Sequence, residues 1–325
     1  MTNNINELGT LYIANRDALK KAFPLESTYI LPSAANKLAA AGVTADVDSL
    51  KETKKIMKAA ISSISYLRGA SDLPLLVEMY LAEDAKAAAE RIEAVYKIFK
   101  KHFTRSEYLA FLAILLGQQL DDEKADALGV RAKKLYDMMK KEHPILTGSE
   151  DSTMAGFMAL SDKDDEQLIT ECEECFDLLK KKFSSKGSVQ SCSQVFAIAD
   201  NGSKEKADKM IALYDLLKEG GRKFDKFYGL PVLAAVSLCE QDIKTIADTM
   251  LEIDDFLKTQ KGYNPLIKDK QTRLLHAAML TSTAFGANEN SKTATLAMMA
   301  AQQAAECAMI TCAIVASTSA ANAAN

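Results

Sequence analysis

The amino-acid sequence predicts an all-α fold made of stacked helical hairpins, and three observations support this prediction. A similar helical phrase occurs five times, each copy is followed by a second apolar segment, and runs of alternating β-branched residues are hard to find. The composition agrees, because helix-favouring residues fill long stretches while the 325 residues include only 14 Gly, 6 Pro and no Trp.

The repeated phrase is typified by ALYDLLKEGG at 212–221. When the five copies are aligned on one aromatic position, successive copies are 40, 40, 38 and 40 residues apart. The aligned residues are Tyr96, Tyr136, Phe176, Tyr214 and Asp254, so the fifth copy carries a carboxylate in place of the ring. A nearly constant step of about 40 residues that holds two helices is typical of stacked helical-hairpin arrays.

The phrase itself predicts the first helix of each hairpin. Ile211, Leu213 and Leu217 recur at helical spacing and form one buried stripe. Acidic residues gather where these helices begin and lysines where they end, as the helix macrodipole favours. Gly220 and Gly262 are predicted to form left-handed caps. A large apolar residue follows each helix, namely Phe103, Ile145, Phe183, Phe224 and Tyr263.

A second, more apolar helix is predicted after each phrase. These helices are expected at 108–116, 153–160, 191–199, 230–238 and 272–280. Before the phrases, residues 5–43 read as one or two helices around Pro24 and Pro32. Asp46 can then cap a helix over 49–63, and 65–84 supplies a helix of the second type.

The same pattern predicts the domain organisation. Residues 1–283 are expected to form a single all-helical repeat domain, with a degenerate N-terminal part over 1–84 and the repeats over 85–283. Residues 284–325 are expected to comprise a linker, an alanine-rich helix and a frayed tail. The alanine-rich helix would either cap the stack or bind a second copy of the chain.

Charge and targeting signals narrow the class of protein. The net charge of −4 argues against a general nucleic-acid binder. The start MTNNINELGTLY lacks the basic and apolar regions of a signal peptide, so a cytoplasmic location with reduced cysteines is expected. The stretch 295–316 is the candidate membrane span, but Gln302, Gln303 and Glu306 in its middle oppose insertion.

The residues that could carry chemistry are few. Cys172 and Cys175 share a helix face, but a structural zinc site needs four ligands, so the sequence favours two core thiols. Of the three histidines, His102 and His143 are expected at helix ends and His276 in the core. The carboxylate-rich SDKDDEQL at 161–168 lacks the spacing of a calcium loop and reads as a helix start. The sequence therefore predicts neither a metal site nor a cofactor.

Lysines at the ends of the first helices form the candidate binding site. If the first helices stack in parallel, these lysines fall on one edge of the array and make a basic ridge. The predicted ridge consists of Lys100, Lys101, Lys140, Lys141, Lys180, Lys181, Lys218 and Lys258, supplemented by Lys182, Arg105, Arg222 and Lys223. The plain alternative is a solvated edge that obeys the helix dipole. The functional hypothesis is that the ridge binds an anionic protein segment or a phosphate-bearing ligand.

Several segments resemble a known bacterial family. They are ANRDALKKAFPLES at 14–27, ADVDSLKETKKIMK at 45–58, SYLRG at 65–69 and the terminal TLAMMAAQQAAECAM. Together with the YDLLK-type phrases, they are similar to domain of unknown function 4003. The resemblance implies an all-helical cytoplasmic bacterial protein, and it carries over no site residues.

These observations favour a non-catalytic helical-repeat module for binding or scaffolding. An enzyme with a carboxylate-based site between helices, built from the acidic helix starts, is the first alternative. A structural protein that forms a homodimer through 294–316 is the second. A deep pocket with converging buried polar groups would favour the enzyme, whereas an open basic groove would favour the binding module.

Overall fold

The computed structural model describes residues 3–26, 30–226, 229–263 and 270–286. In these residues the chain forms fourteen α-helices, one short 3-10 turn and no strand. The helices before the repeated phrases are α1 (Asn3–Ala22), α2 (Leu31–Ala40), α3 (Val47–Ala60) and α4 (Asp72–Leu81), with the 3-10 turn η1 at Gly69–Ser71. The others are α5 (Ala85–Phe99), α6 (Glu107–Leu116), α7 (Asp122–Glu142), α8 (Asp151–Ala159), α9 (Asp165–Leu179), α10 (Lys186–Ile198), α11 (Ser203–Glu219), α12 (Leu230–Ser237), α13 (Ile243–Thr259) and α14 (Lys270–Gly286).

The contacts group the described residues into two compact units. The α2–α8 unit comprises residues 11–26 and 30–159, and the α9–α14 unit comprises residues 3–10 together with the described part of 160–286. The prediction of one domain over 1–283 stays a prediction. The alanine-rich helix predicted near 294–316 lies outside the described residues.

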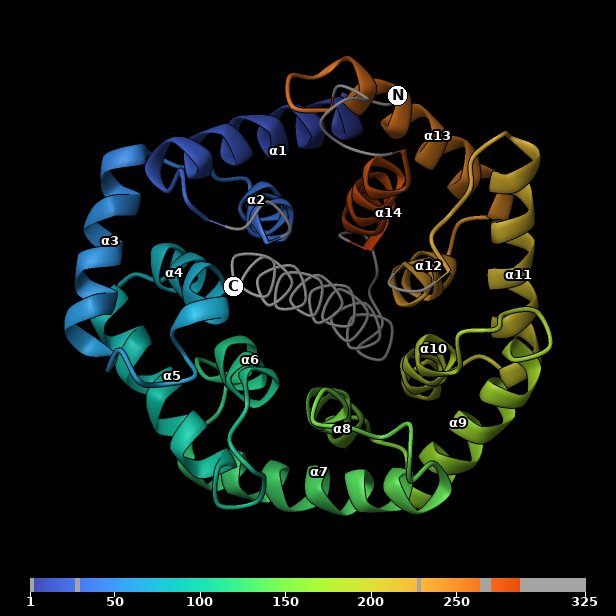
Figure 1. Ribbon diagram of the computed structural model, residues 1–325, viewed down its shortest axis with the longest axis horizontal. Coiled ribbons are helices and arrows are strands. Elements are labelled where there is room, and N and C mark those ends of the chain that lie inside the picture. The colour runs from blue at the N-terminus through green and yellow to red at the C-terminus, as the bar shows by residue number, and fades with distance from the viewer. Residues whose placement is uncertain (1–2, 27–29, 227–228, 264–269, 287–325) are drawn as a thin grey trace, which may run out of the picture. The chain divides into compact units, whose positions relative to one another are not determined.

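Helices pack in hairpins within each unit. The odd-numbered helices α3 to α13 are the first helices of the hairpins, and the even-numbered helices α4 to α14 are the second helices. Each first helix packs against the second helix that follows it. First helices also contact neighbouring first helices, and second helices contact neighbouring second helices, so each unit has two layers (Figure 1). The prediction of an all-α fold built from packed hairpins is therefore confirmed for the described residues.

Acidic residues start most of the first helices by capping them. The side chains of Asp46, Asp84, Asp121, Asp164 and Asp242 each accept a hydrogen bond from a backbone N–H in the following turn. Such a cap contributes about 1 kcal/mol to helix stability. The acidic helix starts predicted from the sequence thus act in large part as N-caps.

The second helices are buried on nearly every side, and several of them carry large apolar side chains. Helix α6 buries Phe111, α8 buries Phe157 and α10 buries Phe196, all close to fully. An α-helix that is apolar all round belongs in a protein interior, where it is covered by neighbours on every face. This explains why the second helices show weak periodicity in the sequence, whereas the first helices show a clear stripe.

The aromatic position of the repeated phrase joins neighbouring hairpins. Tyr96, Phe176 and Tyr214 are buried, and Tyr136 is half-buried. Phe103, which follows α5, packs edge-to-face on Tyr136 of α7 with ring centroids 5.7 Å apart. Phe183 packs in the same way on Tyr214 at 5.2 Å. Such pairs contribute about 0.5–1.5 kcal/mol beyond the apolar area they bury.

In the hairpin of α13 and α14, Asp254 replaces the aromatic ring and recruits two arginines. Asp254 is 0% exposed. Arg273 of α14 binds both its carboxylate oxygens, at 2.7 and 3.0 Å. Arg222, which follows α11, donates from Nε to Asp254 at 2.8 Å and from a terminal nitrogen to Asp255 at 2.8 Å. An ionic cluster thus occupies the place where the earlier hairpins have an aromatic pair.

A basic residue five positions before the aromatic site binds a carbonyl at the end of the second helix of its own hairpin, or in the loop that follows that helix. The bonds run from Arg91 to the Leu120 carbonyl at 2.9 Å, from Arg131 to the Ala159 carbonyl at 2.9 Å, and from Lys209 to the Cys239 carbonyl at 2.7 Å. Carbonyl groups at a helix C-terminus lack intrahelical partners and carry partial negative charge, so a cation there is stabilising.

Three details differ from the sequence-based expectations. The left-handed cap after α11 is Gly221, with φ +76°, and not Gly220, because the helix continues to Glu219 and Gly220 keeps a negative φ of −69°. Gly262 is left-handed with φ +89°, as predicted. Ile145 does not fold back onto α7 and is 96% exposed. Helix α14 extends to Gly286, beyond the expected loop start at 284.

Substitution of Tyr96 by phenylalanine is expected to raise the free energy of unfolding by about 1 kcal/mol. The Tyr96 hydroxyl is buried without a hydrogen-bond partner in the described part of the chain. Burial, with the neighbouring Tyr66 and Glu107, raises the pKa of Tyr96 to about 12. Phe176 shows that a phenyl ring suits this position. Urea unfolding followed by circular dichroism measures the change, and Tyr136→Phe, at a half-buried ring, should shift stability by less. A destabilised Tyr96→Phe variant would contradict this interpretation.

Among the described residues, no helix has both the length and the apolarity to cross a membrane. The candidate span at 295–316 lies outside them.

Candidate functional site

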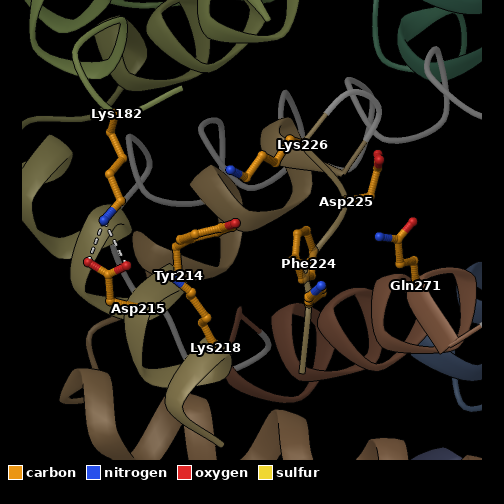
Figure 2. Close-up of a pocket in the computed structure, with 9 residues that line it drawn as sticks. Lys182, Tyr214, Asp215, Lys218, Phe224, Asp225, Lys226 and Gln271 are labelled. Carbon is orange, nitrogen blue, oxygen red and sulfur yellow. Dashed lines mark hydrogen bonds and ion pairs between the residues drawn. The ribbon is translucent and has the colours of Figure 1, made fainter. Parts of the chain in front are cut away.

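A cavity of about 450 Å³ lies beside the C-terminal end of α11, within the α9–α14 unit. Helix α11 contributes Tyr214, Asp215 and Lys218, and the first turn of α14 contributes Gln271. The other lining residues lie in loops, namely Lys182 after α9 and the run Lys223, Phe224, Asp225 and Lys226 after α11 (Figure 2). Four lysines and two aspartates therefore border one cavity.

Tyr214 forms the floor of this cavity. Its ring is 7% exposed and takes the edge of Phe183 at 5.2 Å. The ammonium groups of Lys182 and Lys226 lie 5.9 and 5.5 Å from the ring centroid, within the range of cation–π attraction. The ring thus holds two of the lysines close to the cavity.

Both carboxylates of the cavity already have partners. The two oxygens of Asp215 each lie 2.7 Å from the Lys182 ammonium (Figure 2). Asp225 accepts a hydrogen bond of 2.7 Å from the backbone N–H of Gly229, which closes the turn before α12. Asp215 is therefore neutralised by Lys182, whereas Asp225 keeps its negative charge beside the remaining lysines.

The other polar groups of the cavity have no such partners. Lys218, Lys223 and Lys226 form no ion pair with any residue that the structure describes. The Tyr214 hydroxyl and the Gln271 amide likewise form no hydrogen bond within the described ranges. Three cations and two neutral hydrogen-bonding groups are thus open to a ligand, and this set suits an anion that also carries hydroxyl groups.

Four residues of the predicted ridge lie in the α2–α8 unit, and their surroundings vary. Lys100 caps α5 and lies over the Tyr96 ring at 5.1 Å. Lys101 lies 3.9 Å from Asp126. Lys140 donates to the Thr147 carbonyl at 2.5 Å, and Lys141 is exposed in the last turn of α7. No cavity described in this unit is lined by them.

The other four ridge residues lie in the α9–α14 unit. Lys180 pairs with Asp177 at 2.5 Å, while Lys181 and Lys258 are exposed at the ends of α9 and α13. Lys218 is the ridge residue that lines the cavity. Of the supplementary residues, Lys182 and Lys223 also line it, whereas Arg222 is committed to Asp254 and Asp255.

Five cavity groups are open to a ligand, and three of them were not among the binding residues predicted from the sequence. Tyr214 was assigned to the core because it lies on the apolar stripe, and Lys226 and Gln271 belong to no repeated position. One signal was available in the stretch RKFDKF at 222–227, where basic and aromatic residues alternate after a helix end. The other hairpins have no equivalent stretch.

A second charged cluster lies in the hairpin of α9 and α10, without a cavity. Glu171 stands where the other hairpins carry Arg91, Arg131 and Lys209, and two lysines compensate for the reversed charge. Lys163 and Lys206 each bind Glu171, at 2.8 and 3.1 Å. Both ammonium groups also bind carbonyls at the end of α10, those of Phe196, Ala197 and Ala199. The cluster therefore performs the helix-capping task of the arginines.

The pKa values in this cluster reflect burial and pairing. Burial would raise the pKa of Glu171, but the hydrogen bond from Lys163 and the charge of Lys206 outweigh it, so the pKa lies below its ordinary value of 4.5. Lys206 is 1% exposed, and burial lowers its pKa below 10.5. Every polar contact here is structural, so the cluster offers no open reactive group.

The cysteines are core residues, as the sequence favours. Cys172, Cys175 and Cys192 are buried, and burial raises the pKa of each thiol. A thiol that stays protonated is a poor nucleophile and a poor metal ligand. Within the described ranges, no group of three or more His, Cys, Asp and Glu side chains is arranged to hold a metal ion.

The histidines take structural positions. His102 lies just beyond the end of α5 and its Nε2 is 3.0 Å from Asp126. His143 is the C-cap residue of α7. His276 is buried on α14, where its Nδ1 lies 2.7 Å from the Tyr263 hydroxyl. The predicted locations of all three are confirmed.

Comparison with known proteins gives one match, to a family model. A search of curated proteins and a search of solved structures found no match. One family model, described as "Protein of unknown function (DUF4003)", matches residues 15–318, which is nearly the whole chain. The chain therefore belongs to the DUF4003 family of proteins of unknown function.

Proposed function

We propose that this protein is a non-catalytic helical-hairpin module that binds an anionic partner through the lysine-rich ends of its first helices. The cavity beside α11 is the observation that carries the proposal. It gathers Lys218, Lys223 and Lys226, which form no ion pair with the described residues. Three exposed lysines that border one cavity attract an anion more strongly than isolated surface lysines do, because their potentials add.

The exposed lysines nearby extend this positive surface in the α9–α14 unit. Lys181 and Lys258 end their first helices without an ion pair to the described residues. A partner that binds at Lys218 could therefore also contact other helix ends. The C-terminal ends of the helices carry a partial negative charge, which would otherwise repel an anionic partner. The lysines next to these ends offset that charge.

The alternative of a carboxylate-based enzyme has less support. The acidic helix starts that would supply its bases or ligands are N-caps at Asp84, Asp121, Asp164 and Asp242. Hydrogen bonds from Lys124 lower the pKa of Asp121, and hydrogen bonds from Thr245 lower the pKa of Asp242, so these two carboxylates are weak bases. The cavity, in turn, is lined by four lysines and two aspartates, and one of these aspartates is paired with Lys182. The proposal keeps a cytoplasmic setting, because the buried cysteines of the described ranges form no disulfide.

Charge reversal at the helix ends tests the proposal. The variant carries Lys181→Glu, Lys218→Glu and Lys258→Glu, and labelled polyglutamate is the probe in fluorescence anisotropy. We expect the wild-type chain to bind at an ionic strength of about 0.01 M and to weaken at about 0.15 M, because the Debye length falls from roughly 30 to 8 Å. The variant should bind at least about tenfold more weakly, a difference of about 1.4 kcal/mol.

A matched control separates the ridge from net charge. Lys186→Glu, Lys204→Glu and Lys244→Glu change the charge by the same amount at helix starts in the same unit. This variant should bind polyglutamate within about twofold of the wild type. Equal losses in both variants would show that only net charge matters and would reject the proposed surface. Absence of binding by the wild-type chain at low salt would reject it as well.

A further inference from the structure

We propose that the cavity beside α11 is a binding site for a small phosphate monoester that carries hydroxyl groups, such as a sugar phosphate. This inference rests on the proposed anion-binding function and names the class of ligand. The ammonium groups of Lys218, Lys223 and Lys226 would bind the phosphate, and the Tyr214 hydroxyl and the Gln271 amide would bind the neutral part.

The charges of the cavity match one phosphate monoester. A phosphate monoester carries a charge of about −1.5 to −2 at pH 7 and offers three strong acceptor oxygens. Four lysines and two aspartates line the cavity, which leaves a net charge of about +2. Lys182 is neutralised by Asp215, and the other three lysines form no ion pair in the described ranges. A phosphate group thus finds about one lysine for each acceptor oxygen.

The size and the neutral groups of the cavity favour a ligand larger than inorganic phosphate. Its volume of about 450 Å³ lies within the range of roughly 300–1,000 Å³ that is usual for small-molecule sites. The Tyr214 hydroxyl and the Gln271 amide donate and accept hydrogen bonds without charge. A bare anion would leave both unused, whereas a polyhydroxylated group would bind them.

The aromatic residues argue against a nucleotide. Binding of a base usually requires an aromatic face on which it can stack. Tyr214 and Phe224 are both buried, the Tyr214 ring packs against Phe183, and two lysine ammonium groups lie 5.9 and 5.5 Å from its centroid. Neither ring has a free face for a base. Recognition would therefore depend on charge and hydrogen bonds, which a sugar phosphate supplies.

Isothermal titration calorimetry on the full chain tests this assignment with four probes. They are glucose 6-phosphate, glucose, inorganic phosphate and adenosine monophosphate. We expect glucose 6-phosphate to bind at least about tenfold more tightly than inorganic phosphate and than adenosine monophosphate, and glucose to give no measurable binding. The proposal would be overturned if inorganic phosphate bound as tightly as glucose 6-phosphate. It would also be overturned if adenosine monophosphate bound more tightly than glucose 6-phosphate.

Two variants test which cavity residues bind the phosphate and which bind the neutral part of the ligand. Lys218→Met with Lys223→Met should weaken glucose 6-phosphate and inorganic phosphate alike, by at least about tenfold. Tyr214→Phe should weaken glucose 6-phosphate by about threefold to tenfold and leave inorganic phosphate unchanged, because only the hydroxyl is lost. The control Lys186→Met with Lys204→Met changes exposed lysines elsewhere in the unit and should alter neither affinity. Equal effects of the cavity pair and the control pair would reject the site.

The polyglutamate measurement separates this inference from the proposed function. If polyglutamate binds the wild-type chain and glucose 6-phosphate does not, the phosphate monoester site is wrong and the anion-binding surface stands. If neither probe binds, both are wrong. Because every substituted lysine is exposed, thermal unfolding should be unchanged, which confirms that the variants are folded.

Discussion

Replacement of Asp254 by alanine is expected to lower the free energy of unfolding by about 3–5 kcal/mol. Asp254 is fully buried and receives both a bidentate contact from the buried Arg273 and a bond from Arg222. Without the carboxylate, Arg222 can turn toward water, but Arg273 stays buried with an uncompensated charge. Denaturant unfolding of the α9–α14 unit in the full chain measures the loss.

The neighbouring Asp255 provides a matched control. Its side chain is 64% exposed and pairs with Arg222 at the surface, so Asp255→Ala should change stability by no more than about 0.5 kcal/mol. A double variant with Asp254→Leu and Arg273→Met removes both buried charges. It should lose less stability than the sum of the losses measured for Asp254→Leu alone and Arg273→Met alone. Additive losses would show that the two side chains do not act as a pair.

Replacement of Glu171 by glutamine is expected to lower the free energy of unfolding by about 3 kcal/mol, at the lower end of the range for broken buried ion pairs. Glu171 is the carboxylate that neutralises Lys163 and the fully buried Lys206. Both lysines keep their carbonyl partners at the end of α10, so the loss is smaller than at Asp254. Glu52→Gln, at an exposed pair with Lys55, should change stability by no more than about 0.5 kcal/mol.

The effect of Glu171→Gln should depend on pH in a defined direction. The folded-state pKa of Glu171 lies below its ordinary value of 4.5, so its stabilising contribution is complete above pH 4.5. The contribution is lost as the pH falls through the lowered pKa, because the carboxyl is then protonated in the folded state too. The stability difference between wild type and variant should therefore be constant near neutral pH and shrink in acid. A difference that grows below pH 4 would contradict this role.

Much of the fold could be predicted from local patterns. Apolar spacing identified the first helices, Asp46 marked the start of one of them as an N-cap, and acidic residues marked the starts of others. The left-handed cap was predicted at Gly220 and lies one residue further, at Gly221. Either glycine can take this conformation, and only the position where the helix ends decides which of them does. Ile145 looked like a core residue because it follows a helix end as Phe183 does, but its loop takes another path.

The candidate site could be predicted only in part. Lys218, Lys182 and Lys223 follow from the rule that cations gather at helix C-termini. Lys226 and Gln271 follow from no periodic pattern, because they reach the cavity through a loop and through the start of a helix more than 40 residues further along the chain. In the sequence Tyr214 looks like a core residue. It lines the cavity only because of the elements that surround it, which the sequence pattern does not show.

The sequence by itself determined the hairpin architecture, since the spacing of apolar residues, caps and lysines acts within one or two turns of helix. Only the tertiary structure decided which charges meet. It paired Asp254 with Arg222 and Arg273, and it brought Lys218, Lys223 and Lys226 together without an ion pair among the described residues. The physical reason is that ion pairs between helices depend on loop paths and packing distances of a few ångströms, and Coulomb interactions respond steeply to both distance and burial.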